Sequence, residues 1–282
     1  MNKFLIRTNE DKDEGLKTAG IIKDYLVNAG KEAFIEKIGS KDYTDTEPEY
    51  VLGGSYDCVI VIGGDGTMLR AARDFLNIDV PILGINLGSV GYLTEVNLDE
   101  LDSALEKLVN DEYDIEERMM LEGNPVIGGA ACGHAIALND IAVLKKSPFQ
   151  AISFDIYVNG QFLTGYVADG IIVSTPTGST GYNLSAGGPI VEPPAKLMVM
   201  TPVCPHTINA RSIILSADDE VCITIREGRD NKKQTAVAMA DSANRFELKS
   251  GDCFVLRKSE NRVKFVKLNK ESFLKVLHDK LQ

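Results

Sequence analysis

An aspartate set among glycines is the first feature of this sequence that could do chemistry. Residues 59–72 read VIVIGGDGTMLRAA, so four apolar residues lead into two glycines, Asp65, a third glycine and the start of a helical pattern. Glycines let a ligand approach the backbone closely, and the first N–H groups of a helix attract anions. The turn is therefore suited to binding phosphate.

Asp65 needs a separate explanation, because a carboxylate repels phosphate. It can accept a hydrogen bond or a proton from an alcohol, which is the arrangement of a kinase that holds a phosphoryl group beside an acceptor hydroxyl. It can equally cap the following helix through its own side chain, a role for which Thr67 is also suited. The turn alone does not decide between these interpretations. It lacks the lysine and the spacing of a P-loop.

A second polar stretch favours ligand binding. Residues 169–190 read DGIIVSTPTGSTGYNLSAGGPI, in which a predicted strand over 170–174 leads into a run of hydroxyls and glycines. Short donors and backbone amides suit a polar ligand, and the ring of Tyr182 can stack on a base. The alternative is an ordinary Ser- and Gly-rich loop of a β domain, and the density of small polar groups makes it the weaker interpretation.

The elements around the glycine turn alternate between strand and helix. Strands are predicted at KFLIR, EAFIEKI, YDCVIVI and VPILGIN, helices at EGLKTAGIIKDYLVNAG, from about Thr67 to Phe75 and at LDELDSALEKLVN, and a loop from Gly39 to Ser55. This alternation predicts a doubly wound, Rossmann-like α/β domain with a parallel sheet. Ligands of such sheets bind outside the carboxyl ends of the strands, where the glycine turn lies.

The pattern changes after about Arg118. Short strands recur, Asn159-Gly160 marks a hairpin, and no long amphipathic helix is predicted between Met119 and Leu268. We therefore predict an α/β domain over residues 1–118, an all-β domain over 119–268, and a C-terminal helix over 269–282 that packs on the first domain.

Composition narrows the class of protein. The 282 residues carry a net charge of −11, and the five cysteines are widely spaced, without a C-x-x-C pair. The acidic balance argues against nucleic-acid and anionic-membrane binding, because phosphates recruit Lys and Arg. The cysteines predict free thiols, with no zinc site, and no stretch reaches transmembrane length. We expect a cytoplasmic protein that binds neither nucleic acid nor membranes.

The order of the motifs resembles that of bacterial NAD kinases. From about Val59 to Leu215 the chain contains GGDGT, PILGINLGSVGYLTE, ALND, DGIIVSTPTGSTGYNLSAGGPI and MTPVCPHTINARSIIL in the family's order. GGDGT is shared with diacylglycerol, sphingosine and 6-phosphofructokinase-type kinases, whereas STPTGSTGYNLSAGGP is far more specific. The resemblance implies an α/β domain followed by a β-sandwich domain. It also implies transfer of phosphate from ATP to the adenosine 2′-hydroxyl of NAD⁺, giving NADP⁺ and ADP.

The resemblance assigns roles to residues on both stretches. It makes Asp65 the proton acceptor for that hydroxyl. Around the substrates it places Gly63, Gly64, Gly66, Thr67, Arg70, Asn86, Tyr92, Asn139, Asp140, Asp169, Thr177, Thr180, Gly181, Tyr182, Asn183, Leu184 and Ser185. From the residues alone, Asn139-Asp140 is equally a strand-start turn, and Tyr92 is equally a packing aromatic.

Some positions depart from the family pattern. Val167 stands where Arg is frequent, Ser89 replaces a commonly basic or His residue, and ADSANRFEL over 240–248 lacks the D-G-Q motif. An ionic contact and a Gln contact to the dinucleotide are therefore in question. His206 matches the pattern, and we interpret it as a structural, hydrogen-bonded residue.

The implied substrates are polyanions, so we expect Mg²⁺ to be carried mainly on the nucleotide. The family's habit implies a homo-oligomer, either a dimer or a tetramer. One alternative is a GGDGT-type lipid kinase, against which the polar loop and the lack of a membrane-binding face argue. The other is a non-catalytic NAD(H)-binding sensor. The missing Arg and D-G-Q favour a sensor, and the intact Asp65 favours an enzyme.

Overall fold

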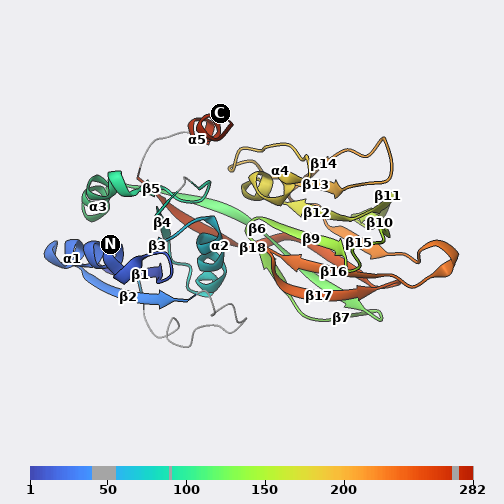
Figure 1. Ribbon diagram of the computed structural model, residues 1–282, viewed down its shortest axis with the longest axis horizontal. Helices are drawn as coiled ribbons and strands as arrows, with labels where there is room; N and C mark the ends of the chain where they lie inside the picture. Colours follow the sequence, from blue (N-terminus) through green and yellow to red (C-terminus); the bar gives the residue numbers. More distant parts are fainter. Residues whose placement is uncertain (40–54, 89–90, 269–272, 282) are drawn as a thin grey trace. The chain divides into compact units, whose positions relative to one another are not determined.

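The computed structural model describes residues 1–39, 55–88, 91–268 and 273–281, and the loop predicted from Gly39 to Ser55 lies almost entirely outside them. The chain divides into two compact units (Figure 1). Unit 1 comprises Met1–Arg118 and Arg262–Gln282, and unit 2 comprises Met119–Asn261.

Unit 1 is the doubly wound α/β unit that the sequence predicts. Its parallel strands β1 (Lys3–Asn9), β2 (Glu32–Ile38), β3 (Cys58–Ile62) and β4 (Ile82–Asn86) lie in the order β2-β1-β3-β4, with the short β5 (Val96–Asn97) beside β4. The helices are α1 (Lys17–Asn28), α2 (Asp65–Asp74) and α3 (Leu101–Val109), with short 3-10 turns at Glu14–Leu16, Leu76–Ile78 and Leu98–Glu100.

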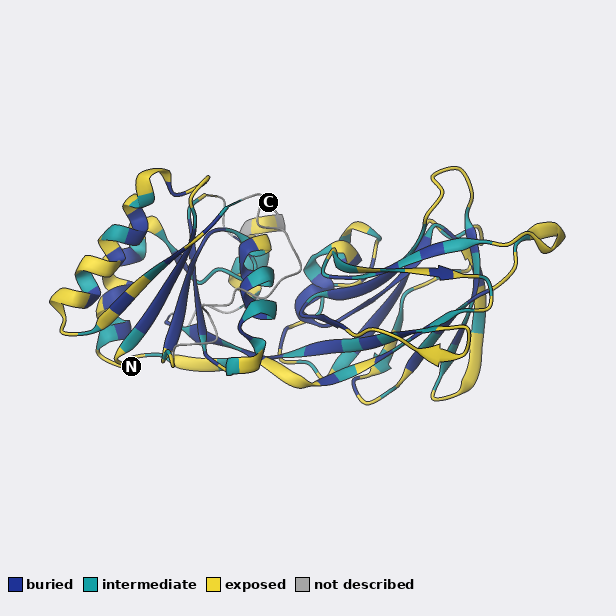
Figure 2. Cartoon of the chain, turned by 90° about the horizontal axis from the view of Figure 1, so that it is seen from below, coloured by how far each residue is buried: buried dark blue, intermediate teal, exposed yellow. Residues whose placement is uncertain are grey.

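The helices cover both faces of this sheet because its strands are apolar on both sides. Phe4, Ile60 and Leu83 point to the face that α1 and α3 bury. On the other face Met68 of α2 packs so closely against Gly84 that a Cβ there would lie 2.8 Å from its sulfur. Figure 1 shows α2 on the opposite side of the sheet from α1 and α3. Strands β1, β3 and β4 are buried along most or all of their lengths, whereas the edge strand β2 has exposed residues (Figure 2).

The strand order fixes where a ligand can bind. The chain moves from β1 outward to β2, then returns past β1 to β3, so the order reverses between β1 and β3. In open parallel sheets, that reversal leaves a crevice outside the carboxyl ends of the two strands. The glycine turn follows β3 directly and therefore lies at this switch point.

A buried cation ties the sheet to α2. The Arg7 side chain is fully buried, with Nε 2.6 Å from Glu36 Oε2 on β2 and Nη1 2.5 Å from Asp74 Oδ2 on α2. Its guanidinium carbon lies 4.2 Å from the centre of the Phe75 ring. Desolvation lowers the pKa of Arg7, but the bonds to both carboxylates outweigh it and hold the pKa above its usual value.

Unit 2 is a β-sandwich. One sheet has the order β14-β13-β12-β9-β16-β17, and the other contains β11-β10-β15-β18, with β6 beside β18 and with β7 and β8 beside β6. Two of its strands also run into unit 1, namely β6 (Asp114–Ile127) and β18 (Cys253–Lys267). The others are β7 (Ala130–Ala131), β8 (Ala135–Ala137), β9 (Asp140–Lys145), β10 (Ile152–Val158), β11 (Gln161–Ala168), β12 (Gly170–Ser174), β13 (Leu197–Val203), β14 (Ile213–Ser216), β15 (Val221–Ile225), β16 (Thr235–Ala240) and β17 (Ala243–Lys249).

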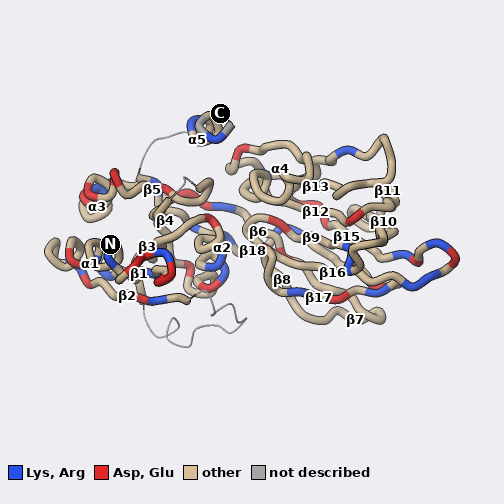
Figure 3. Tube along the Cα trace, viewed as in Figure 1, with Lys and Arg blue, Asp and Glu red and all other residues tan. Residues whose placement is uncertain are grey.

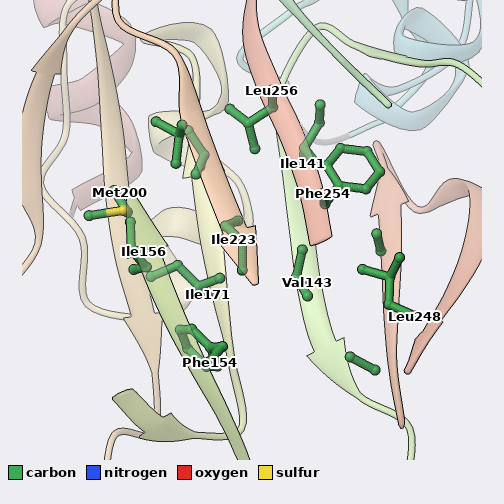
Figure 4. Packing of buried hydrophobic residues seen from close by; sticks show 14 of the residues in the cluster. Ile141, Val143, Phe154, Ile156, Ile171, Met200, Ile223, Leu248, Phe254 and Leu256 are labelled. Atoms are coloured by element: carbon green, nitrogen blue, oxygen red, sulfur yellow. The ribbon is translucent and has the colours of Figure 1, made fainter. Parts of the chain in front are cut away.

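Side chains from both sheets form the core of unit 2. Figure 4 shows Ile141, Ile171 and Met200 from the first sheet in one cluster with Phe154 and Ile223 from the second. The predicted hairpin joins β10 to β11 through Asn159 and Gly160, both with positive φ. The longest α-helix among the described residues of this unit is α4 (Tyr182–Ser185), as the lack of helical periodicity predicts.

β18 carries the chain from unit 2 back to unit 1. The division falls between Asn261 and Arg262, inside the strand, whereas the sequence placed it at 268. No glycine or proline occurs from Cys253 to Leu268 to mark the crossing. Helix α5 (Phe273–Leu281) then belongs to unit 1. None of the described helices is long and apolar enough to span a bilayer.

Arg7→Met should destabilise unit 1 by about 3–5 kcal/mol, because it leaves the buried Glu36 carboxylate without its cation and removes the nearest cation of Asp74. Hydrogen exchange of the β1 and β3 amides would measure the free energy of opening. The matched control is Arg262→Met, which breaks the exposed pair with Glu117 and should cost less than about 1 kcal/mol. Equal losses in the two variants would contradict a structural role for the buried cluster.

Candidate active site

Asp65 is the first residue of α2 and faces a neighbouring loop. Gly64 is the N-cap residue of α2, and no side chain caps this helix. The Asp65 carboxylate instead accepts two backbone hydrogen bonds, from Tyr92 N to Oδ2 and from Leu93 N to Oδ1, each 3.0 Å long. The capping interpretation of Asp65 is therefore wrong, and so is that of Thr67, which lies in the first turn of the helix.

Glycines make this arrangement possible at two positions. A Cβ on Gly91 would lie 2.0 Å from Asp65 Oδ1, so only glycine lets the loop come this close to the carboxylate. A Cβ on Gly63 would lie 2.5 Å from Thr67 Oγ1. Gly64 and Gly66 have open space where a Cβ would be, which leaves the backbone of the turn accessible.

Other predicted residues of unit 1 hold the surroundings of this turn. Asn86 is buried, and its side chain donates to Gly88 O (2.8 Å) and accepts from Gly88 N (3.1 Å), so it shapes the loop after β4. Arg70 Nε lies 3.6 Å from Asp74 Oδ2, beside the Arg7 cluster. The Tyr92 ring has the Lys280 ammonium of α5 4.6 Å from its centre.

Unit 2 brings Asn139 and Asp140 against the predicted polar loop. Thr175 makes two hydrogen bonds to the backbone of Leu138 and Asn139: its N–H donates to Asn139 O (2.8 Å) and its Oγ1 donates to Leu138 O (2.6 Å). A Cβ on Gly178 would lie 2.1 Å from Asn139 O, so glycine is required there for close packing. The polar loop therefore packs directly against the start of β9 and is hydrogen-bonded to the residues before it.

Two polar groups in this structure are unusually placed. The Asn139 Oδ1 atom is buried and has no hydrogen-bond partner, although buried acceptors are nearly always paired. Asp140 is only 7% exposed, and burial, followed by the charge of Asp241, raises the pKa of its carboxyl to about 7. An unpaired acceptor beside a buried acid is suited to a ligand that supplies hydroxyl donors.

The polar loop itself folds into two short turns, a 3-10 turn over Thr177–Thr180 and helix α4. Asn183 is fully buried, and its side chain donates to Ser179 O and Pro189 O and accepts from Thr201 Oγ1. Its side chain therefore serves the shape of the loop. Buried Thr177 accepts through its carbonyl from Thr180 Oγ1 (3.3 Å).

The outer part of the loop is more exposed. Tyr182 is 39% exposed and Ser185 is exposed, while Leu184 and Gly181 are half-buried. A Cβ on Gly181 would lie 3.3 Å from Asn139 Nδ2 and 3.9 Å from Asp140 Oδ2, which places this glycine beside both side chains.

Asp169 precedes β12 and pairs with a lysine. Its Oδ1 atom lies 2.7 Å from Lys145 Nζ, at the end of β9. Val167, at the position where the family frequently has Arg, is 42% exposed. The His206 backbone N–H donates to Val167 O (2.8 Å), while its ring is exposed, so the hydrogen bond of this residue is made by its backbone.

Comparison with known proteins identifies the family. The model of the ATP-NAD kinase N-terminal domain matches residues 4–113, and that of the C-terminal domain matches residues 138–268. The NAD kinase of Lachnoclostridium phytofermentans is 41% identical over 284 residues, which cover 99% of both chains. The NAD kinase of Lachnospira eligens is 40% identical over 294 residues, covering both chains completely.

The chain belongs to the ATP-NAD kinase family. Solved structures agree with the predicted combination of an α/β unit and a β-sandwich. Yeast NADH kinase complexed with NADH is similar in fold, with a TM-score of 0.84 at 22% identity over 99% of this chain and 87% of that one. An NAD kinase from Archaeoglobus fulgidus in complex with ATP has a TM-score of 0.75 at 25% identity over 98% of each chain.

Two residues that support the candidate site of this NAD kinase family member are not among those predicted from the sequence. Asp241 accepts hydrogen bonds from the Leu138–Asp140 backbone, and Gly91 admits the loop to Asp65. A carboxylate in a two-residue turn between strands was the only signal for Asp241. Gly91 could have been found as the glycine that precedes Tyr92 in the family motif.

Asp140 should make the stability of unit 2 depend on pH. Its folded-state pKa of about 7 lies above the ordinary 3.8, so the folded state binds the proton more tightly than the unfolded state. The contribution of Asp140 to the free energy of unfolding is therefore greatest below pH 4. It is lost as the pH rises through 7, by about 4 kcal/mol in total.

Asp140→Asn removes this titration. The free energy of unfolding of Asp140→Asn, relative to that of the unsubstituted chain, should increase between pH 5 and pH 8. Urea unfolding of both proteins at each pH would measure it. A constant difference between the two chains across that range would contradict the raised pKa.

Proposed function

We propose that this protein transfers the γ-phosphoryl group of ATP to the adenosine 2′-hydroxyl of NAD⁺, giving ADP and NADP⁺. The observation that carries the proposal is the place of Asp65. This carboxylate stands at the N-terminus of α2, next to a turn suited to phosphate, and does not serve to cap the helix.

Asp65 keeps capacity for a substrate hydroxyl. A carboxylate has about four lone-pair sites, and the N–H groups of Tyr92 and Leu93 use two of them. In the proposed reaction Asp65 accepts the proton of the 2′-hydroxyl while that oxygen bonds to the γ-phosphorus. The bond from this phosphorus to the bridging oxygen breaks, and ADP leaves.

The Asn139 and Asp140 side chains are the proposed partners of the NAD⁺ hydroxyls. A ribose O–H would satisfy the orphaned Asn139 Oδ1 atom, and an ionised Asp140 would accept a second one. Tyr182 offers an exposed ring for stacking on a base. The other residues of the polar loop, together with Asp169, are proposed to hold the remainder of the dinucleotide.

The phosphates need positive partners. The first N–H groups of α2 supply some, because Asp65 and Gly66 lie in the first turn, where N–H groups lack intrahelical acceptors. Mg²⁺ bound to ATP supplies the larger charge, since this ion typically uses substrate phosphates and water as ligands. Among the described residues no cluster of three or more His, Cys, Asp or Glu is arranged to hold a metal ion.

Several sequence predictions remain part of this proposal. They are the cytoplasmic location, the absence of nucleic-acid or membrane partners, and the dimer or tetramer. Figure 3 shows acidic and basic residues interspersed along much of the trace. The retained Asp65 favours an enzyme over an NAD(H) sensor, and family membership argues against a lipid kinase.

The direct test is an assay of the purified protein with ATP, Mg²⁺ and NAD⁺. We expect NADP⁺ to form in proportion to ADP. No NADP⁺ with ATP, and none with polyphosphate as an alternative donor, would refute an NAD kinase and support the sensor.

Asp65→Asn should fold, although its NH₂ group then replaces one of the two oxygens that accept from Tyr92 N and Leu93 N. It should lose most of kcat with a far smaller change in KM for NAD⁺, because it removes a group that acts mainly in the transition state. The loss is expected to be about 10²–10⁴-fold for a general base. Thermal unfolding and hydrogen exchange of the 91–93 loop would check the fold. Near-normal turnover would show that Asp65 only holds this loop.

The adenosine 2′-hydroxyl should be the acceptor. An NAD⁺ analogue with 2′-deoxyadenosine is therefore expected to bind, as a competitive inhibitor, and to give no phosphorylated product. Mass spectrometry and phosphorus NMR of the product from NAD⁺ itself would locate the new phosphate. Phosphate on the nicotinamide ribose, or turnover of the deoxy analogue, would reverse the proposed orientation of the substrate.

A further inference from the structure

The turn between β16 and β17 is strained. Ala240 pairs with Ala243, so Asp241 and Ser242 alone form the turn, with φ of 45° and 62°. A two-residue turn with positive φ at both positions normally takes Asn-Gly, because residues with a Cβ are disfavoured there. This chain has glycine at neither position, so contacts elsewhere must offset the strain.

Those contacts come from the Asp241 carboxylate. Its Oδ2 accepts from Leu138 N (2.7 Å), and its Oδ1 accepts from Asn139 N (2.9 Å) and Asp140 N (3.1 Å). The Asp241 N–H also donates to Asp140 O (3.0 Å). Four hydrogen bonds thus join one turn residue to three consecutive residues about a hundred positions earlier in the chain.

These bonds fix the segment from one side, and the polar loop fixes it from the other. Thr175 binds Leu138 O and Asn139 O. The backbone of Leu138–Asp140 is thereby held on both sides, while the buried Asn139 Oδ1 atom stays unpaired. This is the condition of a preorganised site, in which the supporting bonds are made before the ligand arrives.

Asp241 also acts on the charge of Asp140. Together with burial, its negative charge raises the pKa of Asp140 to about 7. From the other packed elements, Asp140 faces the phenol of Tyr182 on α4, whose pKa its charge helps to raise, and the hydroxyl-bearing Ser174 opposite it on β12. Asp241 is the one acid that the described residues place against it.

We propose that Asp241 is a positioning residue for the dinucleotide. Its carboxylate holds the Leu138–Asp140 backbone so that Asn139 and Asp140 meet the NAD⁺ hydroxyls. The inference rests on the proposed function. Although residues 240–248 lack the complete D-G-Q motif, Asp241 is present there and can still hold the Leu138–Asp140 backbone.

The test compares Asp241→Asn with the control Ser242→Gly. Asparagine keeps the shape but has one acceptor oxygen, so an NH₂ group faces a backbone N–H. We expect KM for NAD⁺ to rise 10- to 100-fold, with KM for ATP and kcat at saturating NAD⁺ within threefold. Ser242→Gly keeps the carboxylate and suits the positive φ, so it should leave all three constants unchanged.

A pH profile separates positioning from simple stabilisation. The KM for NAD⁺ should fall as the pH rises through about 7, where Asp140 ionises, and this inflection should move to lower pH in Asp241→Asn. If that variant folds poorly, the double variant Asp241→Asn/Ser242→Gly, with a relaxed turn, replaces it.

An unchanged KM for NAD⁺ in a folded variant, or an unmoved inflection, would overturn the inference. So would a parallel rise in both KM values. Failure of the unsubstituted protein to make NADP⁺ would instead refute the proposed function, so the two failures are distinguishable.

Discussion

Backbone N–H groups at the ends of strands and helices must find acceptors, and in this chain carboxylates provide them at the decisive places. Asp13 accepts from Thr18 and Ala19 at the start of α1. Asp65 and Asp241 do the same for loops that come from elsewhere in the sequence. Because a buried, unpaired N–H is costly, each of these carboxylates fixes the path of a loop as well as its own position.

Under the proposed function, this constraint gives Asp65 two roles. The loop that it holds carries Tyr92, and Gly91 in the same loop lets the backbone reach the carboxylate. Because these hydrogen bonds already restrict the Asp65 side chain, positioning it against a substrate costs little further entropy. The same bonds would keep Asp65 in place while its remaining lone pairs engage a hydroxyl.

Local patterns predicted most of the fold, and long-range contacts explain what was missed. β3 and β4 are continuous apolar runs because both faces are buried, and such runs are visible in sequence. The start of α2 was placed two residues late, since a glycine N-cap leaves no side-chain signal. Asn86 and Asn183 are of a residue type that often binds ligands, but in the structure their side chains form hydrogen bonds within the protein that shape the surrounding loops. The partners of Asp241 lie more than a hundred positions away, so local patterns show only that a carboxylate stands in a turn and not what it binds.

The crossing of β18 has a consequence for how the protein is made. Val266 and Leu268 complete the same apolar core as Phe4 and Ile6, yet they follow the whole of unit 2 in the chain. During translation the N-terminal unit therefore stays incomplete while residues 119–261 are synthesised, on the order of ten seconds at ordinary elongation rates. Unit 2 leaves the ribosome whole and uninterrupted. The unit that begins the chain is the last to close its core, and until then its apolar faces are the part of the nascent protein that most needs a chaperone.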